Sequence, residues 1–202
     1  MAELLRQYFR IAFLMGRPQD LPGGSAQMRV GIVLAFVTYV VALLDAHGIG
    51  RAVAHVLLDL GLTALVLYVA LVASGHPGRF EQAFGGLCGA SAFVNAAAIP
   101  IYLSRRSVVD GPPSVTDALA EFVLLVWSLS LLAHVLRHTF ELGIGTSIVI
   151  AFVFVLALVS LMGVVLPPPL PPPMLEEAAS IEGAARLAVT AVPLGHERTA
   201  ML

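Results

Sequence analysis

The stretch AFGGLCGASAFVNAAAIPIYL, residues 83–103, decides the fold of this chain. It is apolar enough to lie in a bilayer, yet it holds few of the large side chains that face lipid. On a helix, Gly85, Gly89, Ala92 and Ala96 would fall on one face, because they recur at spacings of three and four. Small residues on one face let membrane helices approach closely. The stretch therefore predicts a tightly packed central span, with a dimerisation face as the alternative.

The composition of the whole chain gives the same class. Of 202 residues, 58% are hydrophobic and only 12% are charged, whereas a soluble domain carries about 25% charged residues. The eleven basic residues are all Arg and form no run longer than Arg105–Arg106. A nucleic-acid-binding surface needs a larger cluster of basic residues on one face. The single Cys88 cannot form an intrachain disulfide. These features predict an all-α integral membrane protein.

Residues 1–27 are predicted to form an N-terminal amphipathic helix and a connector. Over residues 2–15 the apolar side chains share one side of the helix and the charged side chains share the other. This segment is too short to span a bilayer, so we expect it to lie in the headgroup layer as an interfacial helix. The connector follows at Arg17, where Pro and Gly residues break the helix.

Residues 28–166 are predicted to form a bundle of about five transmembrane helices. Tight turns at residues 46–50 and 74–78 make consecutive spans antiparallel neighbours. Ser114 or Thr116 is expected to cap the fourth helix, whose positive end suits Asp117. The five expected spans, in chain order, are residues 30–44, 52–73, 83–103, 118–136 and 146–166.

Residues 167–202 are predicted to be a proline-rich segment and a flexible tail. The run PPPLPPP at residues 167–173 is typical of a polyproline II rod, roughly 20 Å long. A helix is the expectation around residues 175–189. The excess of Arg in the N-terminal region predicts a cytoplasmic N-terminus, which we expect in a multi-pass protein of a bacterial inner membrane.

Polar residues inside the spans are the candidate functional residues, because ionisable groups are costly in a membrane. His55 and Asp59 are four residues apart and share a helix face, where they could relay a proton or bind a cation. The alternative is that the two side chains satisfy each other near the helix end. Asn95 lies near mid-membrane in the third span, and Glu121 lies near the start of the fourth. The serines of the spans, such as Ser91, are expected to bond to backbone carbonyls.

His134, His138 and Glu141 could place three metal ligands on one face of the fourth helix. A zinc site needs a fourth ligand or an open water position, and no Cys cluster or second His pair supplies one. The alternative is an interfacial cluster in which Arg137 pairs with Glu141. We therefore expect no metal and no cofactor, and the chain has no serine-nucleophile signature of an enzyme.

Residues 75–84, GHPGRFEQAF, resemble the Gly-x-x-Gly-x-Phe-x-Gln turn that leads into a middle helix of the bacterial branch of the Yip family. Residues 98–100, Ala-Ile-Pro, resemble a proline late in that helix. The resemblance implies five close-packed spans and a membrane scaffold without catalytic residues. The Asp-Leu-Tyr-Gly-Pro motif of the eukaryotic members is absent, so vesicle traffic and small-GTPase partners do not follow.

The function expected from the sequence is a non-enzymatic inner-membrane scaffold or assembly protein. Its partners would be the lipid bilayer and either other proteins or further copies of the chain, with no nucleic acid. The second hypothesis is a small oligomeric transporter or ion-coupled permease, whose residues would be His55, Asp59, Asn95 and Glu121. The third is a metal-binding membrane protein that uses His134, His138 and Glu141 of the fourth helix.

Overall fold

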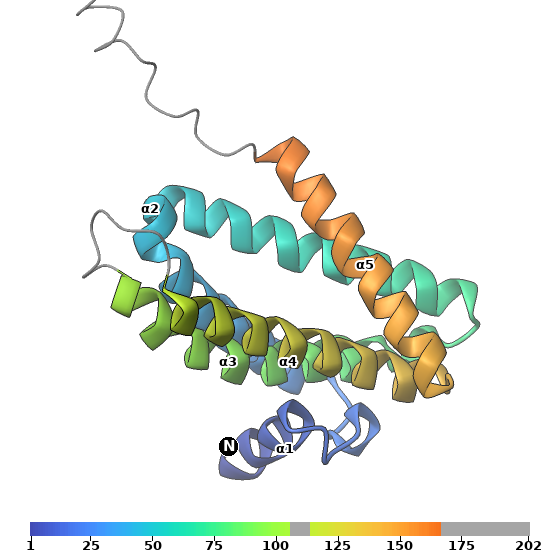
Figure 1. Cartoon of the computed structure of the whole chain (residues 1–202). Coiled ribbons are helices and arrows are strands. Elements are labelled where there is room, and N and C mark those ends of the chain that lie inside the picture. Colours follow the sequence, from blue (N-terminus) through green and yellow to red (C-terminus); the bar gives the residue numbers. More distant parts are fainter. Residues whose placement is uncertain (106–113, 167–202) are drawn as a thin grey trace, which may run out of the picture. The chain divides into compact units, whose positions relative to one another are not determined.

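A computed structural model describes residues 1–105 and 114–166. The polyproline rod and the tail helix that the sequence predicts lie outside the described residues. In the described part every regular element is a helix, as predicted (Figure 1). The elements are α1 (Ala2–Ala12), the short η1 (Pro18–Asp20), α2 (Ser25–Ala73), η2 (Pro77–Arg79), α3 (Phe80–Arg105), α4 (Val115–Phe140) and α5 (Ile144–Val165).

The long helix α2 bends sharply at Gly48. This residue has φ 70° and ψ 162°, a backbone conformation that is open to glycine and strained for other residues. The bend separates two antiparallel arms and confirms the turn predicted at residues 46–50 (Figure 1). Five segments of the described chain are long and apolar enough to cross a membrane: Ser25–Leu44, Gly48–Ala73, Pro77–Leu103, Val115–Phe140 and Ile144–Val165.

The first span begins at Ser25, five residues before the expected start at Val30. The reason is that the polar side chain of Gln27 is only 4% exposed and has partners inside the bundle. Its Nε2 donates a 2.7 Å hydrogen bond to the carbonyl oxygen of Glu81 at the start of α3. A buried amide with partners can lie within a span. The apolar pattern alone therefore predicts a first span that is too short at its N-terminal end.

The ends of α4 follow its sequence. Ser114 is the N-cap, and its hydroxyl accepts a 3.1 Å hydrogen bond from the backbone N–H of Asp117, as predicted. At the other end Glu141 takes the left-handed conformation, with φ 57° and ψ 37°. This left-handed residue ends the helix and lets the chain turn into α5 within a few residues.

The helix α3 is the centre of the packing, in contact with α1, α2 and α4. A Cβ built on Gly31 of α2 would lie 2.5 Å from the carbonyl oxygen of Gly85, so the two backbones touch. Ala92 is 6% exposed, whereas Ala96 is exposed. The small-residue face is thus confirmed as a packing face over its first part, from Gly85 to Ala92.

The helix α1 is present and amphipathic, and it packs against α3 and α4 (Figure 1). The sequence predicts an interfacial helix, and the contacts of α1 show which part of the bundle it lies beside. The ring of Phe9 meets the ring of Phe93 edge-on at 5.6 Å. The indole Nε1 of Trp127 donates a 2.7 Å hydrogen bond to the carbonyl oxygen of Ala12. Because Phe93 and Trp127 lie midway along α3 and α4, α1 lies beside the middle of both helices.

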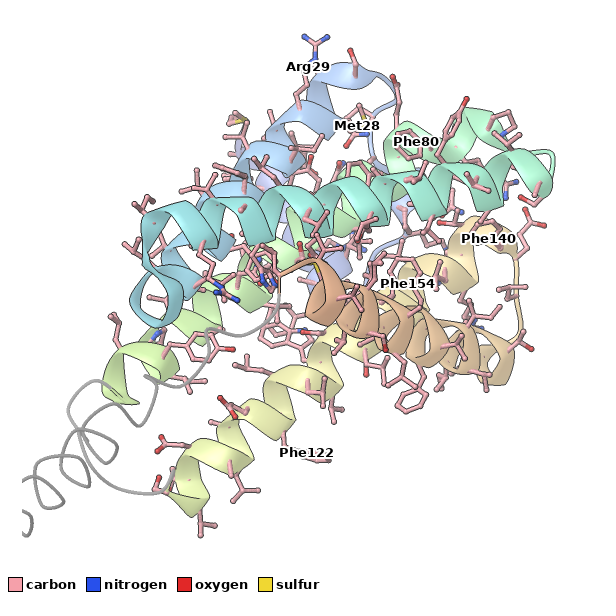
Figure 2. All side chains as sticks on the ribbon, turned by 90° about the horizontal axis from the view of Figure 1, so that it is seen from above. Met28, Arg29, Phe80, Phe122, Phe140 and Phe154 are labelled. Atoms are coloured by element: carbon pink, nitrogen blue, oxygen red, sulfur yellow. The ribbon has the colours of Figure 1, made fainter. Side chains whose placement is uncertain are left out.

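The outside of the bundle is apolar, as a bilayer requires. Phe122 on α4 is 62% exposed and points away from the other helices (Figure 2). The last helix, α5, is the most apolar of the five spans and the least buried. A span with this composition and this little burial is suited to face lipid over much of its surface.

Candidate functional site: a polar cavity inside the bundle

Two adjoining cavities lie between the spans. The first has a volume of about 290 Å³ and is lined by α2, α3, α4 and α5. The second has a volume of about 460 Å³ and lies between α2, α3 and α4. Both are lined by Tyr39, Asn95, Leu125 and Ser128. These shared residues join the two cavities into one polar region of the bundle.

Asp59 lines the first cavity, together with the amide of Asn95 and the hydroxyls of Thr63, Ser91 and Ser128. Asp59 and Asn95 lie near the middle of their spans, Gly48–Ala73 and Pro77–Leu103. None of the described residues donates a hydrogen bond to the Asp59 carboxylate or pairs with it. A carboxylate in this setting is costly when charged, unless a proton or a cation neutralises it.

Glu121 lines the second cavity with Tyr39, Tyr102 and Asn95. This cavity extends along α4 from its middle toward its N-terminal end. Ser128, near the middle of the helix, and Glu121, near its start, both line the cavity. The structure therefore brings three of the predicted residues, Asp59, Asn95 and Glu121, to one connected polar region. All three come from different helices.

His55 is the predicted residue that does not line either cavity. Its ring meets the ring of Tyr39 edge-on, with centroids 6.0 Å apart. Among the described residues no ion pair joins His55 to Asp59, so the predicted mutual pair is not formed there. The helical spacing places the two residues on one side of α2, but the cavity opens only toward Asp59.

The three predicted metal ligands at the end of α4 do not converge on one point. The Nε2 of His134 donates a 2.7 Å hydrogen bond to the carbonyl oxygen of Gly16. The ring of His138 meets that of His134 edge-on at 4.5 Å. Within residues 1–105 and 114–166, no group of three His, Cys, Asp or Glu side chains is placed to hold a metal ion.

Glu141 pairs with Arg79 at 2.7 Å, so the predicted pair with Arg137 is wrong. The cause is the left-handed backbone at Glu141, which takes its side chain off the helix face that Arg137 shares. The hydrogen bond from Arg79, and then its charge, hold the pKa of Glu141 below the ordinary value of a glutamate. Arg79 also donates a 2.9 Å hydrogen bond to the carbonyl oxygen of Thr139.

Three residues of the polar region were not singled out from the sequence: Tyr39, Tyr102 and Thr63. The available signal is that each carries a hydroxyl inside an apolar run. Ser91 behaves as predicted, since its hydroxyl donates a 2.9 Å hydrogen bond to the carbonyl oxygen of Cys88. Cys88 is 2% exposed and lines the same cavity.

No protein-family model, curated protein or solved structure matches this chain. The resemblance to the Yip family therefore stays a prediction. The chemistry of the site is that of the Asp59 carboxylate, which has no partner among the described residues, with hydroxyl and amide groups beside it. The Glu121 carboxylate lies in the adjoining cavity, and the rest of both linings is largely apolar.

Proposed function

We propose that this protein is a small ion-coupled membrane transporter that binds a proton or a small cation at Asp59. The observation that supports this function is the position of the Asp59 carboxylate, at mid-span and facing a cavity without a partner among the described residues. Intramembrane carboxylates in such positions are typical of ion and proton pathways. Hydroxyl, amide and carboxylate oxygens are also the ligands that hard cations prefer.

The second cavity gives the ion a path away from Asp59. Tyr39 and Asn95 line both cavities, and Glu121 lies farther along α4 toward its start. A proton or cation released by Asp59 would meet these groups in turn. Five spans are few for a transporter, so we expect the functional unit to be an oligomer of this chain.

Flux through proteoliposomes tests this function. The measurement is proton uptake with a pH-sensitive dye, made with and without Na⁺ or K⁺ gradients. We expect Asp59→Asn to reduce flux to background, because the substitution removes the charge and keeps the shape. Glu81→Gln is the matched control, since Glu81 is an acid of α3 that lines neither cavity. Unchanged flux in both Asp59→Asn and Glu121→Gln would overturn the proposal.

The scaffold or assembly function is the second candidate, and α1 favours it. Arg6 and Arg10 are exposed on the side of α1 away from the buried Tyr8. Glu3 lies 3.8 Å from Arg6 on the same exposed side. Charged groups beside the middle of a spanning helix are costly in lipid. A partner membrane protein that presents carboxylates would cover this face.

A photo-crosslinking residue in place of Arg6 tests the second candidate in native membranes. A crosslink to a different membrane protein would support assembly, and the mass of the product separates that result from a homo-oligomer. Exclusive crosslinking to lipid would count against it.

For the cellular setting we infer a bacterial inner membrane with a cytoplasmic N-terminal side. Arg17, Arg29, Arg79 and Arg137 all belong to the end of the bundle where α2 and α3 begin and α4 ends. The opposite end holds Arg51 and Arg105 in the part of the chain that the structure describes. The side richer in Arg is the cytoplasmic one by the positive-inside rule.

A further inference from the structure

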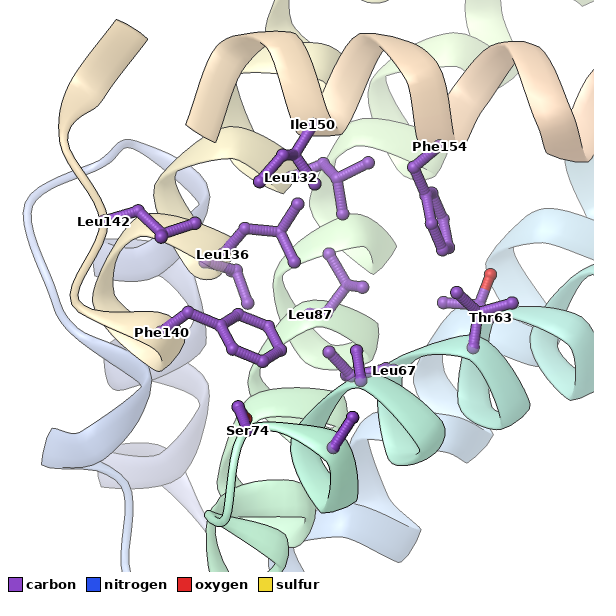
Figure 3. A pocket seen from close by; sticks show the side chains of 14 residues that line it. Thr63, Leu67, Ser74, Leu87, Leu132, Leu136, Phe140, Leu142, Ile150 and Phe154 are labelled. Atoms are coloured by element: carbon purple, nitrogen blue, oxygen red, sulfur yellow. The ribbon is translucent and has the colours of Figure 1, made fainter. Parts of the chain in front are cut away.

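A long apolar groove lies between the second arm of α2, the end of α4 and the start of α5 (Figure 3). Its volume is about 420 Å³, and Thr63 and Ser74 are the polar residues among those that line it. Leu67, Leu136 and Phe140 point into it (Figure 3). From Ser74 to Thr63 the groove follows α2 for about 16 Å, at 1.5 Å per residue. Its size and lining suit a hydrocarbon chain.

A polar cavity adjoins one end of this groove. It has a volume of about 480 Å³ and lies where η1, η2 and the end of α4 come together. Leu142 lines both the groove and this cavity. The charged and polar lining residues are Arg17, Gln19, Asp20, Arg79, Arg137, His138 and Glu141.

The polar cavity has a positive balance, with three guanidinium groups against two carboxylates. Arg79 forms an ion pair with Glu141, with 2.7 Å between its guanidinium nitrogen and the carboxylate oxygen. Asp20 accepts a 3.0 Å hydrogen bond from the backbone N–H of Arg17. In the described chain the guanidinium groups of Arg17 and Arg137 form no ion pair with a carboxylate. Both are therefore available to an anionic group that enters from the membrane surface.

We propose that the groove and the polar cavity together bind one anionic phospholipid. The phosphate lies between Arg17 and Arg137, and one acyl chain lies in the groove beyond Leu142. The apolar groove alone would accept the chain of any lipid. The arginines at its end select the headgroup, because basic pockets beside spanning helices bind anionic lipids. The proposal does not depend on ion transport.

The bound acyl chain would also touch the wall of the Asp59 cavity. Thr63, Leu87, Leu132 and Phe154 line both the groove and that cavity. Phe154 comes from α5 and faces α2 across the groove (Figure 3). A chain in the groove would therefore fill the space between α2 and α5 and close the lipid-facing side of the polar region.

Native mass spectrometry of the full chain, with phosphatidylglycerol and phosphatidylcholine of identical chains in competition, tests the proposal. We expect the wild-type protein to retain phosphatidylglycerol with a preference of roughly tenfold, and raised salt to reduce that preference. The double variant Arg17→Gln, Arg137→Gln should lose it. Arg29→Gln is the matched control, because Arg29 is exposed at the same end of the bundle and points away from it (Figure 2).

A second variant tests the groove itself. Ala70 lines the groove, so Ala70→Phe should fill it and weaken binding of both lipids several-fold. Ala54→Phe on the exposed side of α2 is the control. Glycerophosphoglycerol, the same headgroup without chains, should bind far more weakly than the intact lipid. Equal retention of the two phospholipids by the wild-type protein would overturn the proposal without any variant. Equal losses in Arg29→Gln and the double variant, or in Ala54→Phe and Ala70→Phe, would also overturn it.

Discussion

The ring of Tyr8 lies directly against the backbone of Gly89, in a notch where only a glycine leaves room for it. The Tyr8 hydroxyl donates a 2.5 Å hydrogen bond to the carbonyl oxygen of Gln27, so one side chain joins α1, α2 and α3. Tyr8 is fully buried, and burial raises the pKa of its phenol to about 12. The hydroxyl therefore stays a donor throughout the pH range in which the protein can be handled.

Gly89→Ala is predicted to destabilise the bundle, because its Cβ would collide with the Tyr8 ring. Overpacking of this kind costs about 1–3 kcal/mol. Gly61→Ala on α2 is the matched control, since a Cβ there meets no atom within 4 Å. That substitution should stabilise its helix by about 0.5–1 kcal/mol. Thermal unfolding in detergent measures the stability of both variants. Equal unfolding temperatures would contradict the prediction that a Cβ at position 89 collides with the Tyr8 ring.

The Arg79–Glu141 ion pair predicts an acid-dependent stability. Because the pKa of Glu141 is lowered in the folded state, the pair stabilises the protein above the ordinary glutamate pKa of about 4.3. That contribution is lost as the pH falls through the lowered folded value. The wild-type protein should therefore exceed Glu141→Gln in thermal stability at neutral pH, and the difference should shrink in acid. The difference should be small, since Glu141 is exposed.

Arg79→Gln supplies the comparison for this pair. This substitution should lower the thermal stability more than Glu141→Gln does, because it also removes the hydrogen bond to the carbonyl oxygen of Thr139. A stability difference between wild type and Glu141→Gln that is independent of pH would show that the pair does not act in this way.

Thr139→Val is predicted to leave the protein as stable as the wild type or more so. Thr139 is 1% exposed, and its hydroxyl has no hydrogen-bond partner in the described chain. A buried hydroxyl without a partner costs about 1–3 kcal/mol, and valine keeps the shape. Thr38→Val is the contrast, because the Thr38 hydroxyl donates a 2.8 Å bond to the carbonyl oxygen of Leu34. Unfolding temperatures that fall in Thr139→Val would point to an unseen partner of that hydroxyl.

The sequence predicts the parts of this fold that depend on local chemistry. Apolar runs mark the five spans, and the Ser114–Asp117 cap follows from two residues three positions apart. The close approach of α2 and α3 follows from the small residues around Gly85, because a helix face without side chains can only serve close packing.

The parts that the sequence does not predict depend on distant neighbours. An amphipathic pattern is the same for a helix on a lipid surface and for one in a protein groove, so the place of α1 beside Phe93 is not readable from it. Glu141 pairs with Arg79, 62 residues away, because the chain leaves the helix at that position. The convergence of Asp59, Asn95 and Glu121 depends on how three helices are rotated against one another.

Asn95→Leu is predicted to block ion flux while Asp59 remains in place. Asn95 lines both cavities, and an apolar side chain of similar size at their junction would remove the amide that an ion meets between Asp59 and Glu121. Proteoliposome flux should fall at least tenfold, which corresponds to about 1.4 kcal/mol on the barrier. Glu81→Gln is again the control, because Glu81 belongs to the same helix and lines neither cavity. Full flux in Asn95→Leu, with loss in Asp59→Asn, would mean that the ion leaves the Asp59 cavity by another route.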